Sequence, residues 1–300
     1  MENDAQPIRY KRWEDVPERL LSKSALREKG LKPGLDVRGM VYMKSRHIWV
    51  ELFDEKEAIP RKPATPKQLA ALEKAKAAQI EARTCRSCGQ IHTKALSGKL
   101  CDFCTKELWL EQESLRAYER FCIWVDRAAE YAVLDVETNG LDDAAEIVEI
   151  AIVGLDEKVL YHSLIKPQRS ISIESTFVHG ITDYVVAGAP HWDEVWPEVR
   201  SVLAKRTTLI FNEGFDARMV YSACRRYGFP VERIESECVM ETYARYVQSY
   251  NHYHRNFTWI SLRDALLFEN VSGSIPHRAT GDGILTVRLI NTIAKKHSTT

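Results

Sequence analysis

Alternating apolar and polar stretches are clearest in the last two thirds of the chain. Runs of apolar, β-branched residues predict three buried strands at 131–137, 146–153 and 159–165, and a fourth, short strand at 208–211. Helical spacing predicts helices near 192–203, 214–227, 260–267 and 281–294. Gly228 is expected to end the second of these helices. Strands joined by short turns, followed by strands that alternate with helices, predict an α/β domain: a mixed sheet flanked by helices.

The first 60 residues form a region of different character. The aromatic and β-branched run HIWVELF predicts a β-hairpin around residues 40–53. A linker, IPRKPAT, then leads into an Ala-rich helix that runs to Arg83. Its start is marked by Thr65 as N-cap, Pro66 at the first helical position and Gln68 to complete a capping box. We therefore predict a small N-terminal region, residues 1–60, ahead of a helical segment.

A second amphipathic helix is expected before the α/β domain. Its predicted face comes from apolar side chains at intervals of seven, three, four and three residues: Leu108, Leu115, Tyr118, Cys122 and Val125. Packing between domains is the simplest account of Trp109, Phe121 and Trp124, and stacking against nucleic acid is the alternative. The domain boundaries predicted are 1–60, 61–128 for the helices and the cysteine-rich segment between them, and 129–300.

Length and composition bound the class of protein. A chain of 300 residues has room for about two domains, with 45% hydrophobic residues, as is ordinary for a protein with a substantial core. No signal-peptide core and no apolar run of the roughly 18 residues that span a bilayer is present, so a cytoplasmic protein without a membrane segment is expected. The net charge is zero, but residues 1–130 carry 25 basic against 20 acidic side chains. The excess of basic side chains either attracts the phosphate backbone of a nucleic acid or lies on a solvated surface without a binding role.

Four of the seven cysteines have the spacing of a metal site. Cys85 and Cys88 form one C-x-x-C pair, and Cys101 and Cys104 form a second pair twelve residues later. Four thiolates with this spacing predict one structural, tetrahedral Zn²⁺ site, with His92 as an alternative ligand. The remaining alternatives are a redox motif or two unrelated cysteine turns. A zinc module of this kind suits binding of nucleic acid or docking of a protein partner.

Acidic residues from three separate segments are the strongest sign of chemistry. Asp135 and Glu137 are two apart on a predicted strand, so both side chains point to the same face. Asp216 and Asp282 fall in the first turns of two predicted helices, and His277 precedes the second of these. Carboxylates gathered in one cleft repel one another and need cations, and hard ions such as Mg²⁺ or Mn²⁺ prefer oxygen ligands. The pattern predicts a two-metal site.

These motifs resemble the DEDDh subgroup of the DnaQ-like 3′-to-5′ exonucleases, which includes proteins similar to the epsilon subunit of DNA polymerase III. Such enzymes have an Asp-x-Glu on the first strand, an Asn-x-x-x-Asp entering a helix and a His-x-x-x-x-Asp near the end of the domain. Here they correspond to LDVETNG, FNEGFDARM and PHRATGD, and the likeness runs from about 132 to 293. Phe211 departs from the family, in which many members have histidine at that position. The resemblance implies a ribonuclease-H-like fold and hydrolysis of phosphodiester bonds with two Mg²⁺ or Mn²⁺ ions.

The resemblance also implies roles for individual residues. Asp135, Glu137, Asp216 and Asp282 would bind the metal ions, with Asp216 acting through water or in support of the other three. His277 would accept the proton of the attacking water, on a loop between Pro276 and Gly281. The family pattern places the terminal nucleotide against four further residues: Thr138, Leu141, Asn212 and Phe215. Ordinary core packing is an equal account of Leu141 and Phe215, and His179 is expected to be a structural hydrogen-bonding residue.

The resemblance therefore implies a metal-dependent 3′-to-5′ exonuclease that releases nucleoside monophosphates from single-stranded or frayed DNA 3′ ends. An enzyme that trims RNA 3′ ends is the first alternative, because relatives hydrolyse either polymer at the same kind of site. A catalytically silent adaptor that binds nucleic acid is the second. The intact set of acidic residues favours an active enzyme.

Overall fold

The computed structural model describes residues 6–231, 233–273 and 277–296, which form two compact units divided between Lys99 and Leu100. Pro276, predicted to border the loop of His277, lies outside the described residues. No helix in the described parts of the chain is long and apolar enough to cross a membrane.

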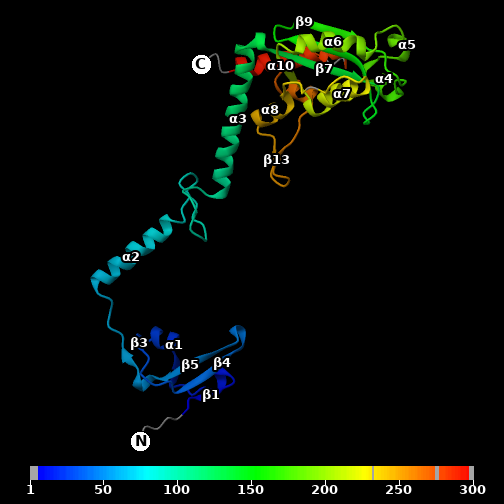
Figure 1. Ribbon diagram of the computed structural model, residues 1–300. Helices are drawn as coiled ribbons and strands as arrows, with labels where there is room; N and C mark the ends of the chain where they lie inside the picture. The colour runs from blue at the N-terminus through cyan, green and yellow to red at the C-terminus, as the bar shows by residue number, and fades with distance from the viewer. Residues whose placement is uncertain (1–5, 232, 274–276, 297–300) are drawn as a thin grey trace. The chain divides into compact units, whose positions relative to one another are not determined.

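The first unit is built on a small four-stranded sheet in the order β1-β4-β5-β2 (Figure 1). The predicted hairpin is confirmed, because β4 (Gly39–Met43) and β5 (Ile48–Asp54) pair antiparallel. Leu20, Val41 and Leu52 form its buried core. The other elements of this unit are β1 (Ile8–Tyr10), β2 (Leu20–Ser22), α1 (Lys23–Glu28), β3 (Leu31–Lys32), β6 (Ile59–Pro60) and α2 (Pro66–Glu81).

Helix α2 starts where its sequence predicts. The Thr65 side chain accepts a hydrogen bond from the backbone N–H of Gln68 at 3.3 Å, and the Gln68 side chain accepts one from the Thr65 N–H at 2.9 Å. All residues of α2 are exposed. Because no apolar face holds it in place, this helix depends on its cap and on the high helix propensity of its alanines.

The second unit is organised around a five-stranded mixed sheet in the order β11-β10-β7-β8-β9. Strands β7, β10 and β11 run parallel, and β8 and β9 are antiparallel to their neighbours. The sheet consists of β7 (Tyr131–Thr138), β8 (Ile147–Gly154), β9 (Val159–Leu164), β10 (Thr207–Ile210) and β11 (Ser236–Cys238). A separate two-stranded hairpin is formed by β12 (Tyr250–Asn251) and β13 (Asn256–Phe257).

Helices cover both faces of this sheet (Figure 1). Alternate residues of β7 therefore enter two different cores. Ala132 and Leu134 pack with α6 and α7, whereas Tyr131 and Val133 pack with α3, α8 and α10. The helices of this unit are α3 (Asp102–Asp126), α4 (Ile173–His179), α5 (Asp183–Val186), α6 (Trp192–Leu203), α7 (Glu213–Arg226), α8 (Val239–Tyr246), α9 (Leu262–Phe268) and α10 (Ala279–Lys295).

The predicted strands and helices of the α/β domain agree with these bounds to within about two residues, and Gly228 follows α7 with a φ of +75°. The predicted face of α3 is partly wrong. Leu108 and Leu115 are 44% and 57% exposed, while Tyr118, Cys122 and Val125 are partly buried. The fully buried side chains of its apolar face are Phe121 and Trp124, which pack against β7, α8 and α10. Helix α3 is therefore an integral part of the second unit.

Candidate active site

Strand register brings the acidic motifs together. Asp135 and Glu137 lie in the last half of β7, on the same side as Val133 and thus on the α10 side of the sheet. Ile210, the last residue of β10, pairs with Leu134, so that the segment from Asn212 to Asp216 emerges beside Asp135. Asp216 is 5% exposed in the first turn of α7.

Helix α10 brings the fourth carboxylate against the sheet. Asp282 lies in its first turn and is 8% exposed. The next residue, Gly283, permits a close approach, because a Cβ at that position would lie 3.1 Å from Cγ2 of Val153 on β8. A larger residue at 283 would push the first turn of α10, and with it Asp282, away from β7.

The result is a cluster of carboxylates with the dimensions of a metal site. One carboxylate oxygen each from Asp135, Glu137 and Asp282 lies within 4.8 Å of the others. Asp216 is outside this trio but close enough to interact electrostatically with Asp135 and Glu137. The structure thus gathers the predicted acidic residues, three of them in direct reach of one cation.

Burial and mutual repulsion raise the pKa values of the carboxylates in the cluster. Burial raises the pKa of Asp135 well above its ordinary value, and the charges of Asp216, Glu137 and Asp282 raise it further. Burial, followed by repulsion from Asp282 and Glu149, raises the pKa of Glu137 to about 8. Burial likewise raises the pKa of Asp282 to about 6, against the opposing effect of His277. The pKa of Asp216 is raised by burial and by Glu137.

A divalent cation fits this cluster. Within the described residues, the buried Oδ1 atom of Asp282 has no hydrogen-bond partner, and a buried oxygen of that kind is costly unless something binds it. The donors are all carboxylate oxygens, which are the ligands that Mg²⁺ and Mn²⁺ prefer. Both the negative charge gathered in the cluster and the unsatisfied Oδ1 atom of Asp282 therefore indicate a site that suits a cation.

His277 lies at the edge of the cluster and is exposed to solvent. Its backbone has a φ of 48°, in the left-handed region that few residues other than glycine adopt. Its backbone N–H is hydrogen-bonded to Asp282. The backbone of His277, the predicted general base, therefore contacts the carboxylate cluster directly before α10 begins.

A buried ion-pair network that sequence reasoning missed supports this arrangement. Glu149 on β8 is 1% exposed and lies opposite Glu137 in the strand register. It accepts hydrogen bonds from Arg278 Nε at 2.9 Å, Arg278 Nη2 at 2.6 Å and the backbone N–H of Ala279 at 3.0 Å, and it contacts His162 Nε2 at 2.8 Å. Burial acts to raise the pKa of Glu149, but the hydrogen bonds from Arg278 and His162 outweigh it, so the pKa is lowered. Glu149 thus holds the residues directly after His277.

His179 has the structural role predicted for it. It is 5% exposed, its Nδ1 accepts the backbone N–H of Ile181 at 3.0 Å, and its Nε2 lies 3.1 Å from the carbonyl oxygen of Thr138. An acceptor at Nδ1 requires the neutral form with the proton on Nε2, which then donates to Thr138. Burial lowers the pKa of His179, in agreement with this neutral form.

The four residues predicted to contact the terminal nucleotide have different environments. Leu141 is 78% exposed and Asn212 is exposed at the start of α7, so neither is a core residue. Phe215 is partly buried against the α6–α7 core, with the Arg218 guanidinium 5.3 Å from its ring centre. Thr138 is 7% exposed and its hydroxyl donates to the carbonyl oxygen of Gly140 at 2.6 Å. Phe211, the departure from the family pattern, is buried in the core of the α10 face.

Comparisons with known proteins agree with this geometry. A family model for exonucleases, RNase_T, matches residues 132–290, more than half of the chain. The chain belongs to this exonuclease family. Its mixed sheet flanked by helices is the predicted ribonuclease-H-like fold.

Individual relatives of the exonuclease domain are also similar. The uncharacterized exonuclease CP81 of Escherichia phage 186 is 34% identical over 169 residues, which are 54% of this chain and 87% of that protein. The DNA polymerase III subunit epsilon of Buchnera aphidicola subsp. Baizongia pistaciae is 31% identical over 98 residues, 29% of this chain and 40% of the subunit. A solved structure of exonuclease X in complex with 5′-overhanging duplex DNA has 25% identity and a TM-score of 0.42, and the match covers 55% of this chain and 92% of that one.

The four predicted cysteine ligands lie close together. The Sγ atoms of Cys85, Cys88, Cys101 and Cys104 are all within 4.8 Å of one another, in a group that does not include His92 among the described residues. A tight turn shapes the first pair, since the N–H of Gly89 donates to the carbonyl oxygen of Cys85 at 2.9 Å and Gly89 has a φ of +72°. The arrangement is suited to a metal ion bound by four thiolates.

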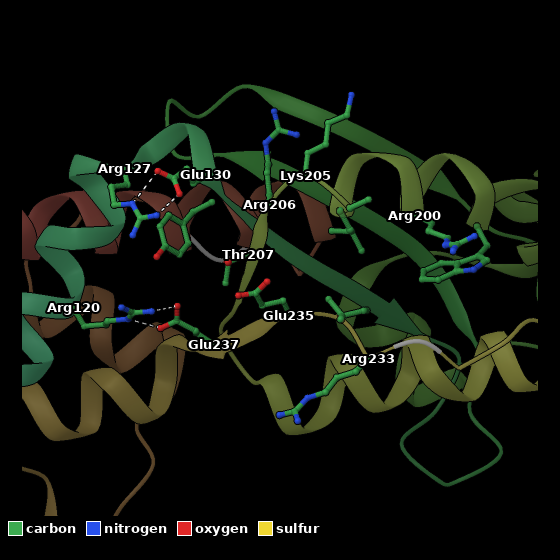
Figure 2. A pocket seen from close by; sticks show the side chains of 15 residues that line it. Arg120, Arg127, Glu130, Arg200, Lys205, Arg206, Thr207, Arg233, Glu235 and Glu237 are labelled. Carbon is green, nitrogen blue, oxygen red and sulfur yellow. Dashed lines mark hydrogen bonds and ion pairs between the residues drawn. The ribbon is translucent and has the colours of Figure 1, made fainter.

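The exonuclease domain also has a cavity that is separate from the carboxylate cluster. It has a volume of about 750 Å³ and is lined by Tyr131 and Thr207, the first residues of β7 and β10 (Figure 2). Asp135 and Glu137 lie in the other half of β7. Figure 2 shows that two of its arginines are occupied by ion pairs, Arg120 with Glu237 and Arg127 with Glu130. The Arg120 pair joins α3 to β11 and so contributes to the fold.

Proposed function

We propose that this protein is a metal-dependent 3′-to-5′ exonuclease that releases nucleoside monophosphates from single-stranded or frayed DNA 3′ ends. The observation that carries the proposal is the convergence of Asp135, Glu137 and Asp282 within 4.8 Å, with Asp216 buried beside them. Membership of the exonuclease family supports nuclease activity. The direction of digestion and the preference for DNA come from the DEDDh resemblance.

Asp135, Glu137 and Asp282 are the residues that would hold a first Mg²⁺ or Mn²⁺ ion. Asp135 would also contribute to a second ion, with Asp216 acting through water. When bound, such ions stabilise negative charge on the attacking and leaving oxygens of phosphodiester hydrolysis. The raised pKa values of the four carboxylates support this assignment, since cations are what would allow all of them to be ionised together.

His277 is proposed as the general base. It takes a proton from the attacking water while the water oxygen bonds to phosphorus, and the bond from phosphorus to the 3′ oxygen of the preceding nucleotide breaks. The leaving 3′ oxygen takes up a proton from solvent. The products are a nucleoside 5′-monophosphate and a strand shortened by one nucleotide with a free 3′ hydroxyl. Its exposure and its link to Asp282 through the backbone N–H support this role, because an incoming strand can reach its ring.

The terminal nucleotide is proposed to lie against Thr138, Leu141, Asn212 and Phe215. The exposure of Leu141 and Asn212 supports this role, because both side chains are available to a ligand. Leu141 supplies an apolar surface for the base. Because Thr138 already donates its hydroxyl to the carbonyl oxygen of Gly140, that hydroxyl can take part in a hydrogen bond with the substrate only as an acceptor.

The test is digestion of end-labelled single-stranded and duplex DNA and RNA, each with and without Mg²⁺. We expect 5′-labelled DNA to shorten one nucleotide at a time only in the presence of the cation, and Asp135→Ala to abolish the reaction. Faster digestion of RNA would favour the enzyme that trims RNA. Binding of DNA without release of mononucleotides, in Mg²⁺ and in Mn²⁺, would favour a silent adaptor and overturn the proposal.

The four-cysteine cluster is proposed to hold one structural Zn²⁺ ion. Its binding energy, roughly 10 to 16 kcal/mol for small zinc modules, would then fold the segment around it. Elemental analysis should find one zinc per chain in the wild type and none in Cys101→Ser. Cys122→Ser, which changes a partly buried cysteine outside the cluster, should keep its zinc. A natively folded protein that contains no zinc would contradict this assignment.

A further inference from the structure

The hairpin β12–β13 and the start of α3 form a groove of aromatic side chains within the second unit. Its volume is about 430 Å³. We call it the aromatic groove, and its lining includes Trp109, Arg245, Tyr250, Arg255, Phe257 and Trp259. None of these residues belongs to the acidic cluster or to the predicted nucleotide pocket.

Three rings at the base of the groove hold one another in place. The Trp109 ring centre is 5.5 Å from that of Tyr250 and 5.7 Å from that of Phe257, and the Tyr250 and Phe257 centres are 5.3 Å apart. The Lys106 ammonium lies 3.7 Å from the Trp109 ring centre and 3.6 Å from that of Tyr250. These cation–π and edge contacts fix the rings before any ligand arrives.

Two further aromatic side chains of the hairpin segment are left open to solvent. Trp259, at the rim of the groove, is 70% exposed, and Tyr253, in the hairpin loop, is 89% exposed. Phe121 and Trp124 of the neighbouring helix are 0% exposed, so the fold buries aromatic rings where it uses them for packing. The side chains of Trp259 and Tyr253 are therefore accessible to a ligand, and the His254 ring makes an edge contact with Tyr253 at 4.9 Å between ring centres.

Positive charge accompanies the rings. Arg255 is exposed in the hairpin loop, and the Arg245 guanidinium lies 4.9 Å from the Phe257 ring centre while it donates to Glu113 at 2.7 Å. Glu241 is the one acidic residue among the described residues that line the groove. Aromatic rings interleaved with cations match a single-stranded nucleic acid, whose bases stack on rings and whose phosphates attract arginine and lysine.

We propose that the aromatic groove binds unpaired bases of the substrate strand away from its 3′ end, with bases stacked on Trp259 and Tyr253 and phosphates near Arg255. This inference rests on the proposed function, because it names a second contact for the strand whose 3′ end is digested. Its consequence is selectivity: the groove favours a single strand over a blunt duplex, whose bases are already stacked. A site for a protein partner on the same face is the competing use of these rings.

Binding is measured with full-length protein carrying Asp135→Ala, so that the DNA stays intact, by fluorescence anisotropy of a labelled 20-nucleotide single strand. Trp259→Leu and Tyr253→Leu should each weaken binding by about 5- to 150-fold, the loss expected for one stacked base. Trp259→Phe retains a ring and should lose much less than Trp259→Leu, which retains only apolar area. Phe268→Ala, which removes an exposed ring of α9 outside the groove, should bind like the parent.

Two further results decide between stacking and its competitors. Affinity for a blunt duplex should change much less than affinity for the single strand in both leucine variants. In the active protein, Trp259→Leu should raise KM for the 20-mer by a larger factor than for the p-nitrophenyl ester of thymidine 5′-monophosphate, which has a single base.

Unchanged affinity for the single strand in both leucine variants would overturn the proposal that the groove binds nucleic acid and would favour a protein partner. Equal losses of affinity for single strand and duplex would overturn base stacking. Both outcomes leave the proposed function intact if the wild type still digests DNA in Mg²⁺. Absence of metal-dependent digestion by the wild type would instead remove the proposed function itself.

Discussion

His277 is the residue whose chemistry can be isolated most cleanly, because it is exposed and its hydrogen bond to Asp282 comes from the backbone N–H, which an alanine would keep. We expect His277→Ala to lower kcat by about 10²- to 10⁴-fold, the usual contribution of a general base, with the fold retained. Single-turnover release of labelled mononucleotide at saturating Mg²⁺ measures this. His47→Ala is the matched control, since His47 is also exposed and has a φ of 51° but lies in the first unit. Equal rates in wild type and His277→Ala would exclude the histidine as base.

Arg278 positions His277, the proposed general base, because its side chain donates to the buried carboxylate of Glu149. We expect Arg278→Ala to lower the free energy of unfolding by up to about 3 kcal/mol, because it leaves the buried Glu149 with fewer donors, and partial exposure of the arginine reduces the effect. Denaturant titration measures the loss. Arg288→Ala should leave stability nearly unchanged, since its pair with Glu157 is exposed on both sides. A loss for Arg278→Ala no larger than for Arg288→Ala would show that the network does not support the site.

The sequence predicted the acidic residues and the histidine of the candidate site but not Glu149 and Arg278, and the reason is physical. An ordered set of motifs specifies residues that touch the same ligand. The contact between Glu149 and Arg278 depends instead on the strand register that sets Glu149 opposite Glu137 and on the way α10 approaches the sheet. One signal was available: Glu149 interrupts the apolar run IVEIAIVG, and a charge in a fully buried strand requires a partner.

Among the elements, α3 depends most on packing. Trp124 is 0% exposed, forms an edge contact with Phe121 at 5.0 Å between ring centres, and donates from Nε1 to Glu237 at 3.3 Å. We expect Trp124→Ala to lower the free energy of unfolding of the second unit by about 3 to 5 kcal/mol, the cost of removing a large buried aromatic side chain. Leu115→Ala on the same helix should have little effect, because Leu115 is 57% exposed. Similar losses for both variants, in urea melts followed by circular dichroism, would mean that α3 buries a different face.

The two long N-terminal helices show which part of an element sequence can predict. The start of α2 was predicted because its cap is local chemistry among Thr65, Pro66 and Gln68. The buried face of α3 was misassigned at Leu108 and Leu115 because the helix carries more apolar positions than it buries. Which of them become covered is decided by α8 and α10, which come more than a hundred residues later in the chain. Periodicity contains no information about those partners.

At the scale of the whole exonuclease unit, the acidic site opposes folding unless cations are bound. Four carboxylates are held where their pKa values are raised, so the folded protein without metal retains protons that the unfolded chain has already released. Stability from these groups is present at low pH and is lost as the pH rises through about 6 for Asp282 and about 8 for Glu137. Glu149 has a lowered pKa and titrates below this window, so it does not mask the trend. Cation binding and folding are therefore linked through pH.

This linkage predicts that Mg²⁺ raises the melting temperature of the second unit more at pH 8.5 than at pH 6. At a concentration of a hundred times Kd, a bound ligand adds about 2.7 kcal/mol, and protonated carboxylates at pH 6 weaken that binding. Thermal melts followed by fluorescence report on this unit, because Trp124 and Trp192 are fully buried in it. Glu137→Gln combined with Asp282→Asn should be more stable than wild type at pH 8.5 without Mg²⁺, and should respond little to the ion. An equal effect of Mg²⁺ at both pH values, or in the double variant, would mean that the ion stabilises the protein somewhere other than at these carboxylates.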